Sequence, residues 1–253
     1  MSLTAQEKAA LLRTLEGLTP EQQQWVKKTI LAFGAPRKFR RNEESDIVTN
    51  RVLEAFGDRL IAHHANSRQA LTKDRFEFAF EAALNDSQIS AQLVKSRTNR
   101  GHDITINGVP ISLKTEAAAH IRKDFIHVSK WMELGKGEWN LPLLRAAFLE
   151  HMRSYDRIFT LRCLSADPTA IEYELVEIPK ALLHEVETCE LEVREESRQN
   201  PKPGYGYVRD NSGNLKFALY FDGGTERKLQ IKSLRKNLCV KHAEWIFGSA
   251  VAG

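Results

Sequence analysis

The dipeptide Asn107-Gly108 lies between two segments in which apolar and polar residues alternate. It is the strongest local signal for a two-residue β-hairpin turn, because both central residues must adopt a positive φ. The turn fixes the register of its two strands, and counting outward from it sets Asp103 opposite Ser112. The sequence therefore predicts a hairpin with strands over 103–106 and 109–116.

The two faces of this hairpin differ in character. One face is entirely apolar and consists of Ile104, Ile106, Val109, Ile111 and Leu113. The other face carries Asp103 and, one diagonal step from it, Lys114. We therefore expect one face to be buried in the core, while a carboxylate and an ammonium meet on the other, uncovered face.

Phosphodiester hydrolysis is a reaction that needs this pair of groups. Magnesium prefers hard oxygen ligands and keeps several of its waters, so one or two carboxylates can hold it. A nearby lysine can orient the attacking water and offset the negative charge that develops on the phosphate. The alternative is an ordinary surface Asp–Lys pair, which contributes no more than about 1 kcal/mol.

The order of motifs around the hairpin resembles the PD-(D/E)xK nuclease core. A predicted helix over 72–84 contains Glu81, the segment Gly101-His102-Asp103 follows it, and Ser112-Leu113-Lys114 lies on the next strand. The resemblance implies that Asp103 binds the metal, that Lys114 is the catalytic lysine and that Glu81 is the helix glutamate.

Two narrower resemblances concern branches of these nucleases. The segments 73–81, 113–115 and 228–232 are similar to the MutH-like branch. The stretches GHDITI, LKTEAA, IHVSKWMELGKGEW, LVEIPK and PKPGYGY look like the Sma-type type II restriction endonucleases, which cut a GC-rich palindrome. This likeness extends from about residue 20 to residue 245.

Ser112 departs from the nuclease pattern, which expects a second carboxylate there. Serine is a poor magnesium ligand, so another residue must supply the second carboxylate ligand of the metal. Glu116 shares the strand face with Lys114 and reaches the metal only if the strand bends. Glu81 is the other replacement, and Glu77, one helical turn before it, ranks behind both.

The stretch 227–241 contains six basic residues and no acidic one. If 228–232 is a strand, its polar side chains point one way and its apolar ones into the core. Lysine and arginine can pair with guanine in the major groove, whereas lysines that guard an exposed edge strand are the alternative. The residues expected to contact DNA, including some from the neighbouring loops, are Arg227, Lys228, Gln230, Lys232, Arg235, Lys130, Arg97 and Arg100.

Charge and composition narrow the class of protein. Residues 170–196 carry nine Glu against two basic residues, which leaves 35 basic and 24 acidic residues elsewhere, as expected when one surface faces a polyanion. No apolar run approaches the roughly 20 residues that cross a bilayer, and no signal peptide begins the chain, so we expect a cytoplasmic protein without membrane contact. The three widely spaced cysteines are expected to be reduced thiols.

These observations predict an α/β fold, in the form of an α+β mixed sheet with a restriction-endonuclease-like PD-(D/E)xK core flanked by helices over 72–84 and 141–152. We expect a single endonuclease domain over 1–253, with an N-terminal helical region (1–45) that forms a helical hairpin, a catalytic core (46–185) and a β-rich DNA-contacting region (186–253).

The predicted function is that of a type II restriction endonuclease, which hydrolyses duplex DNA with Mg²⁺ at a GC-rich palindrome such as CCCGGG. A palindromic target favours a homodimer, with a monomer as the alternative. Two other functions stay open: a mismatch-repair-type nickase, and a DNA-binding protein with a defunct centre. The absence of a carboxylate at Ser112 is the feature that supports the non-catalytic DNA-binding protein.

Overall fold

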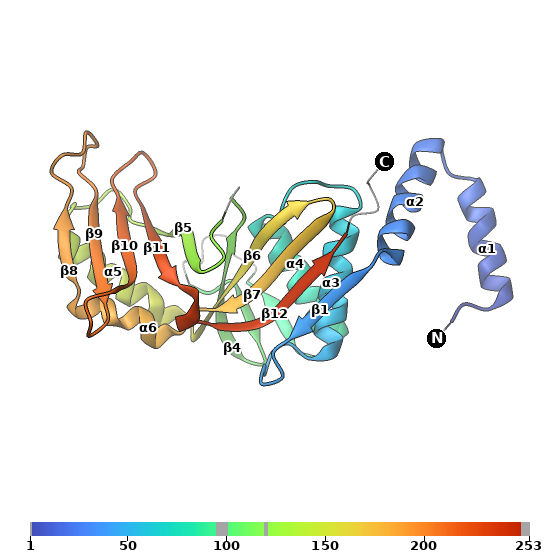
Figure 1. Ribbon diagram of the computed structural model, residues 1–253, viewed down its shortest axis with the longest axis horizontal. Helices are drawn as coiled ribbons and strands as arrows, with labels where there is room; N and C mark the ends of the chain where they lie inside the picture. Colours follow the sequence, from blue (N-terminus) through green and yellow to red (C-terminus); the bar gives the residue numbers. More distant parts are fainter. Residues whose placement is uncertain (1, 95–100, 119–120, 249–253) are drawn as a thin grey trace.

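The computed structural model describes residues 2–94, 101–118 and 121–248. Its strands form two sheets that lie next to each other along the length of the molecule (Figure 1). The first sheet has the order β1-β12-β7-β6-β4-β3-β2, and the second has the order β5-β11-β10-β9-β8. Since β4 and β6 run parallel and the other pairs antiparallel, the first sheet is mixed, and the predicted fold class is confirmed.

The first sheet holds the predicted hairpin. Its strands are β1 (Arg37–Arg41), β2 (Ala91–Leu93), β3 (Ile104–Ile106), β4 (Val109–Glu116), β6 (Arg157–Asp167), β7 (Ala170–Glu177) and β12 (Val240–Phe247). Asn107 and Gly108 have φ values of 48° and 83°, and Ile104 pairs with Ile111 as predicted. The turn chemistry therefore sets the register that the sequence indicated.

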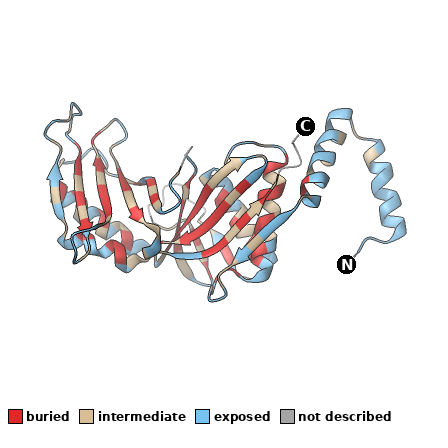
Figure 2. Cartoon of the chain, viewed as in Figure 1, coloured by how far each residue is buried: buried red, intermediate tan, exposed pale blue. Residues whose placement is uncertain are grey.

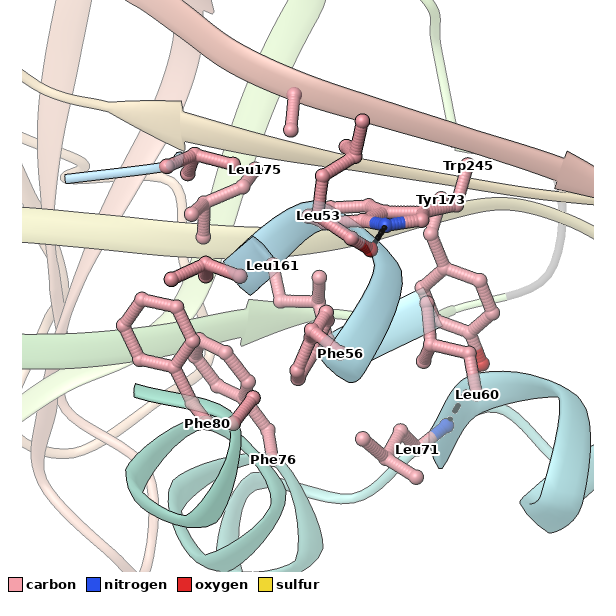
Figure 3. Close-up of a cluster of buried hydrophobic side chains, with 14 of the residues drawn as sticks. Leu53, Phe56, Leu60, Leu71, Phe76, Phe80, Leu161, Tyr173, Leu175 and Trp245 are labelled. Atoms are coloured by element: carbon pink, nitrogen blue, oxygen red, sulfur yellow. Dashed lines mark hydrogen bonds between the residues drawn. The ribbon is translucent and has the colours of Figure 1, made fainter. Parts of the chain in front are cut away.

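The helices α3 (Asn50–His64) and α4 (Lys73–Asp86) cover one face of this sheet (Figure 1). Figure 3 shows the core between these helices and the sheet, where Phe56 of α3 packs edge-on against Phe80 of α4 and Trp245 of β12. The indole N–H of Trp245 donates to the carbonyl of Leu53 at 2.9 Å, so its polar atom is satisfied inside the core. The apolar face of the hairpin packs into the same core, as predicted.

The second sheet has a core of its own. Its strands are β5 (Phe125–Glu133), β8 (Glu190–Val193), β9 (Gly204–Arg209), β10 (Leu215–Asp222) and β11 (Lys228–Arg235), and the helices α5 (Leu141–His151) and α6 (Lys180–His184) pack on it. The helix predicted over 141–152 was expected to flank the sheet of the hairpin. Instead, Leu144 and Phe148 of α5 share a core with Phe217 and Leu219 of β10. Ile158 of the first sheet joins this core, which therefore bridges the two sheets.

The predicted boundaries at 46 and 186 do not separate the sheets. β5 comes from the middle of the chain and lies in the second sheet, whereas β1 and β12 come from its two ends and pair in the first. The run RKFRR forms β1 although four of its five residues are basic. Its backbone nevertheless completes the edge of the sheet by pairing with β12.

The N-terminal helical hairpin is present as predicted, as α1 (Ala5–Glu16) and α2 (Pro20–Gly34). Capping boxes begin both helices: Thr4 with Glu7, and Thr19 with Gln22. The hairpin projects away from the sheets at one end of the molecule (Figure 1), and no residue of α1 is buried (Figure 2).

Short 3-10 helices complete the fold, at η1 (Met152–Ser154), η2 (Glu185–Thr188) and η3 (Lys236–Leu238). The three cysteines are free, as predicted. Among the described residues, no helix combines the length and apolar character needed to span a bilayer.

Candidate active site

Asp103 lies directly before β3, and its carboxylate turns toward β4. Oδ2 accepts the backbone N–H of Leu113 at 2.6 Å and the hydroxyl of Ser112 at 3.1 Å. The hairpin therefore brings Asp103 to the strand that carries Lys114, and the charge of each residue affects the pKa of the other. Ser112, which replaces the expected carboxylate, holds the aspartate in place.

This face of the hairpin is covered, contrary to the expectation of an open one. The exposed fraction of Ser112 is 1% and that of Lys114 is 7%. The cover includes Trp131 of β5, whose ring centroid lies 5.4 Å from Nζ of Lys114. The indole of Trp131 donates to the hydroxyl of Tyr155 at 3.1 Å. Because β5 is the first strand of the second sheet, that sheet begins beside the hairpin that carries Asp103 and Lys114.

Lys114 is a buried ammonium whose hydrogen-bonding capacity is unused. In the part of the chain that the structure describes, no acceptor is hydrogen bonded to its Nζ. Burial lowers the pKa of this group to about 8, although the nearby Asp103 carboxylate opposes the shift. A lysine that is mostly buried, has a lowered pKa and lies beside a carboxylate is a candidate functional group.

Lys73, the first residue of α4, bridges two carboxylates. Its Nζ lies 2.7 Å from Oδ1 of Asp103 and 3.1 Å from Oε1 of Glu77. Glu77, one turn into α4, is therefore the helix carboxylate that shares a cation with Asp103. Both carboxylate side chains are 19% exposed, so they are accessible to a small ligand.

The charge states of these carboxylates follow from their partners. Burial tends to raise the pKa of Asp103, but Lys114, Lys73 and the Leu113 N–H outweigh it, and the pKa lies below the usual value. For Glu77, burial prevails over the opposing charge of Lys73, and the pKa lies above the usual value. Asp103 is therefore the more firmly ionised of the two.

The glutamates predicted at the site are held elsewhere. Oε1 of Glu81 accepts the backbone N–H of Leu93 at 2.7 Å, which ties α4 to β2. Glu116 accepts hydrogen bonds from the Nε–H of Arg162 at 2.5 Å and from the backbone N–H of His127 at 3.0 Å. The strand does not bend to bring Glu116 back toward Asp103. The structure brings Asp103, Lys114 and Glu77 together and leaves both predicted glutamates outside the group.

Two carboxylates converging on one cation form a donor set that suits magnesium. Within residues 2–94, 101–118 and 121–248, no group of three His, Cys, Asp or Glu side chains is arranged to hold a metal. Magnesium does not require such a cage, since it keeps waters and uses one or two carboxylates. The ammonium of Lys73 marks the point that the oxygens of Asp103 and Glu77 both reach.

The predicted DNA-contacting strand is β11, with the alternation expected from the sequence. Leu229 and Ile231 are fully buried in the second core, while Lys228, Gln230 and Lys232 lie on the opposite face. Gln230 donates from its amide to Asp222 Oδ2 at 3.1 Å.

Three tyrosines of β9 and β10 share this face, a group that the sequence analysis missed. The rings of Tyr205 and Tyr207 stack with centroids 5.4 Å apart, and Tyr220 lies 4.8 Å from Tyr205. Nζ of Lys232 lies 3.5 Å from the ring centroid of Tyr220. The motif Tyr-Gly-Tyr was the available signal, because alternation places both tyrosines on one face.

The remaining basic candidates lie around this face and have partners. Arg227 donates to the carbonyl of Gly137 at 3.2 Å. Lys130 pairs with Glu133, and Arg235 pairs with Asp210. Arg97 and Arg100 lie outside the described residues.

Comparisons with known proteins identify the family of the chain. The family model SmaI, described as a type II site-specific deoxyribonuclease, matches residues 11–247. A curated protein of Serratia marcescens, the "Type II restriction enzyme SmaI", is 52% identical over 237 residues, which cover 93% of this chain and 96% of that protein. The predicted resemblance to Sma-type enzymes is confirmed. The chain therefore belongs to the SmaI family of type II site-specific deoxyribonucleases.

Proposed function

We propose that the chain cleaves duplex DNA with Mg²⁺ at a GC-rich palindrome such as CCCGGG, using Asp103, Glu77 and Lys114. The observation that carries the proposal is the meeting of two carboxylates at one cation, beside a buried lysine that lacks an acceptor. We further propose that the site is a PD-(D/E)xK centre of the MutH-like branch in which Glu77 replaces the carboxylate missing at Ser112.

Type II restriction enzymes generally need a divalent metal ion, and in this proposal the ion is Mg²⁺ held by Asp103 and Glu77. Both supply the hard oxygens that Mg²⁺ prefers. When bound, the ion supplies positive charge that stabilises the phosphoryl group under attack. Ser112 and the Leu113 N–H keep the Asp103 carboxylate oriented, since both bond to its second oxygen.

Lys114 acts on the phosphate in this proposal. Its unused N–H donors can bind a nonbridging phosphate oxygen and offset the charge that grows there during attack. Trp131 excludes water from one side of the ammonium, which strengthens that interaction. Among the described residues, no hydrogen-bond acceptor competes with the phosphate for Nζ of Lys114.

The polar face of the second sheet, where Gln230 is 8% exposed and Lys228 and Lys232 are partly exposed, is the proposed DNA-contacting surface. Lys228 and Lys232 supply positive charge there, and Gln230 has its amide oriented by Asp222. Amide and ammonium groups can contact base edges or phosphates, whereas tyrosine rings can pack against sugars and bases. Arg227, Arg235 and Lys130 surround this surface, and we propose that they exchange their present partners for phosphates.

The wider setting follows from the same proposal. The two sheets act as one nuclease domain, because β5 contributes to both the catalytic site and the proposed DNA surface. A palindromic target favours a homodimer, in which each protomer cuts one strand. We also propose a cytoplasmic location, because the DNA that a restriction enzyme cleaves has entered the cell.

The test is cleavage of a supercoiled plasmid that contains one CCCGGG site. With Mg²⁺ the wild type is expected to give linear DNA with ends mapping to that site, and with a chelator it is expected to give none. Glu77→Gln is expected to lower the cleavage rate about a hundredfold or more, because it removes a charged metal ligand. Glu81→Gln, which keeps an acceptor for the Leu93 N–H, should cleave within a few-fold of the wild type.

The same experiment separates the alternatives. Nicked circles that never become linear would indicate a nickase, and specific binding without cleavage would indicate a defunct centre. Equal loss of activity in Glu77→Gln and Glu81→Gln would contradict the assignment of Glu77. Fragment ends at another sequence would overturn the proposed target while leaving the site intact.

Lys232→Met tests the proposed DNA surface. We expect about tenfold weaker binding of the target duplex, since a desolvated cation that contacts DNA is lost. If Lys232 contacts a phosphate, the slope of log affinity against log salt falls by about 1, and nontarget DNA is affected equally. If it reads guanine, the loss is confined to the target. Lys8→Met, on the distant α1, serves as the control, and equal affinities for both variants would exclude the surface.

A further inference from the structure

We propose that Lys73 occupies the position of the divalent cation in the metal-free protein and leaves it when the ion binds. Lys73 is then a positioning residue, which keeps two carboxylates together until the metal arrives. The inference rests on the proposed function, because it requires Asp103 and Glu77 to be the metal ligands.

The contacts of Lys73 carry this inference. Its Nζ lies 2.7 Å from Asp103 and 3.1 Å from Glu77, so one cation serves two carboxylates from different elements. Among the described residues, no other cation lies within ion-pair distance of either carboxylate. Without the ammonium, two partly buried negative charges would face each other, and Lys114, which is outside ion-pair distance, would be the cation left to offset them.

The place of Lys73 in its helix gives a second, independent reason. Lys73 is the first residue of α4, at the positive end of the helix dipole, where a cation is unfavourable. The preceding Thr72 makes no side-chain capping bond that would compensate. The helix alone would therefore favour an acidic residue here, and the two carboxylates supply the attraction that holds the lysine.

Lys73 is also able to leave. Its side chain is 41% exposed, in contrast to the buried Lys114, and its four-carbon stem is flexible. A divalent ion carries twice the charge of an ammonium and is attracted more strongly to the same oxygens. The ion binds only those molecules in which Lys73 has moved away from the carboxylates. Its apparent affinity is therefore lower when Lys73 still bridges the carboxylates in a larger fraction of the molecules.

The exchange has a structural consequence. While Lys73 bridges the carboxylates, α4 and the hairpin stay joined at the site without any metal. The ligands are thus held near each other before the ion binds, and the cost is a lower apparent affinity for the ion.

Calorimetric titration of the full chain with Mg²⁺ and with Ca²⁺, in the absence of DNA, tests the exchange. Lys73→Met is expected to bind both ions about tenfold more tightly than the wild type, since no lysine competes. Lys73→Arg keeps the positive charge and is expected to stay near the wild-type affinity. Lys241→Met is the matched control, because it removes a similar half-exposed lysine that pairs with Glu244 at 2.7 Å on β12.

Thermal unfolding gives a readout that does not depend on activity. In a chelator, Lys73→Met should melt below the wild type, because the carboxylates repel each other, and saturating Ca²⁺ should remove the difference. Lys241→Met should show the same difference from the wild type with and without Ca²⁺.

The outcomes separate the two proposals. Unchanged or weaker ion binding by Lys73→Met, with normal binding by the wild type, would overturn the exchange and leave the metal site intact. Ion binding that survives in both Asp103→Asn and Glu77→Gln would instead overturn the proposed ligands.

Discussion

Lys114→Met is expected to cleave DNA at least about a thousandfold more slowly than the wild type, and yet to be more stable by about 3 kcal/mol at pH 7. The loss of activity follows from the removal of the ammonium proposed to act on the phosphate. The gain in stability follows from burial, which lowers the pKa of Lys114 from 10.5 to about 8. At pH 7 the folded protein must keep this buried lysine largely charged, and methionine removes that cost.

The pH dependence gives the sign of the effect. Between pH 8 and 10.5 the unfolded chain holds a proton on Lys114 that the folded chain has released, so the contribution of this residue to stability rises with pH. The advantage of Lys114→Met over the wild type is therefore full below pH 8 and disappears as the pH passes 10.5. Urea unfolding of both proteins at a series of pH values measures this difference.

Lys38→Met, at an exposed position of β1, is the control for this experiment. Its unfolding free energy should stay within about 0.5 kcal/mol of the wild type at each pH. Lys114→Met would contradict the prediction if it were less stable than the wild type at pH 7, because Lys114 would then stabilise the fold. DNA binding by Lys114→Met, measured with a chelator present, should remain.

The hairpin could be predicted because its causes are local. Asn107-Gly108 defines a turn type, the turn defines the register, and the register places Asp103 by the strand of Lys114. The helices α1, α2 and α4 were predictable for the same reason, α1 and α2 through their caps and α4 through its apolar spacing.

The second carboxylate depended on nonlocal packing. Glu77 and Glu81 lie one turn apart on one helix, and the sequence alone favoured Glu81. The two glutamates differ because β2 packs beside α4, and the backbone N–H of Leu93 in β2 donates a hydrogen bond to the carboxylate of Glu81. The i, i+4 pair of Lys73 and Glu77 was visible in the sequence, but its meeting with Asp103 was not.

Glu116 was misplaced for a related reason. Its position on the face of Lys114 was predicted correctly, yet the charge that it meets comes from a parallel neighbour. Arg162 of β6 pairs with Glu116 in the sheet register, and only the crossover through α5 brings those strands together. No local pattern indicates which strand will be adjacent after such a crossover.

Arg162→Met is expected to destabilise the protein by about 3–5 kcal/mol, because it leaves the buried Glu116 without a cation and the buried Glu174 with only Lys236, at 3.0 Å. The guanidinium is fully buried and binds Glu116 and Glu174. It also donates to the carbonyl of Arg122, just before β5, and to that of Phe125, the first residue of β5, each at 2.7 Å. Arg162 therefore joins the first sheet to the start of the second, where Trp131 covers Lys114.

The destabilisation should diminish as the pH falls. Burial already raises the pKa of Glu116, and loss of Arg162 removes the charge that opposes this shift. A carboxyl whose folded pKa is raised costs stability when it is charged, so acidification toward that pKa should narrow the gap to the wild type. Urea unfolding at pH 7 and pH 5.5 measures the gap.

Two variants show whether the loss of stability in Arg162→Met arises from the burial of Arg162 with Glu116 and Glu174. Arg157→Met, on the same strand, removes an arginine that is 25% exposed and pairs with Asp46 and Glu177. Its cost should be smaller, about 1 kcal/mol, because water replaces part of the lost interaction. Adding Glu116→Gln and Glu174→Gln to Arg162→Met should recover much of the stability, since no buried charge is then left alone. Equal costs for the two arginine variants, with no recovery in the triple variant, would mean that Arg162 acts through packing volume, and the link between the sheets would have to lie in the apolar core that they share.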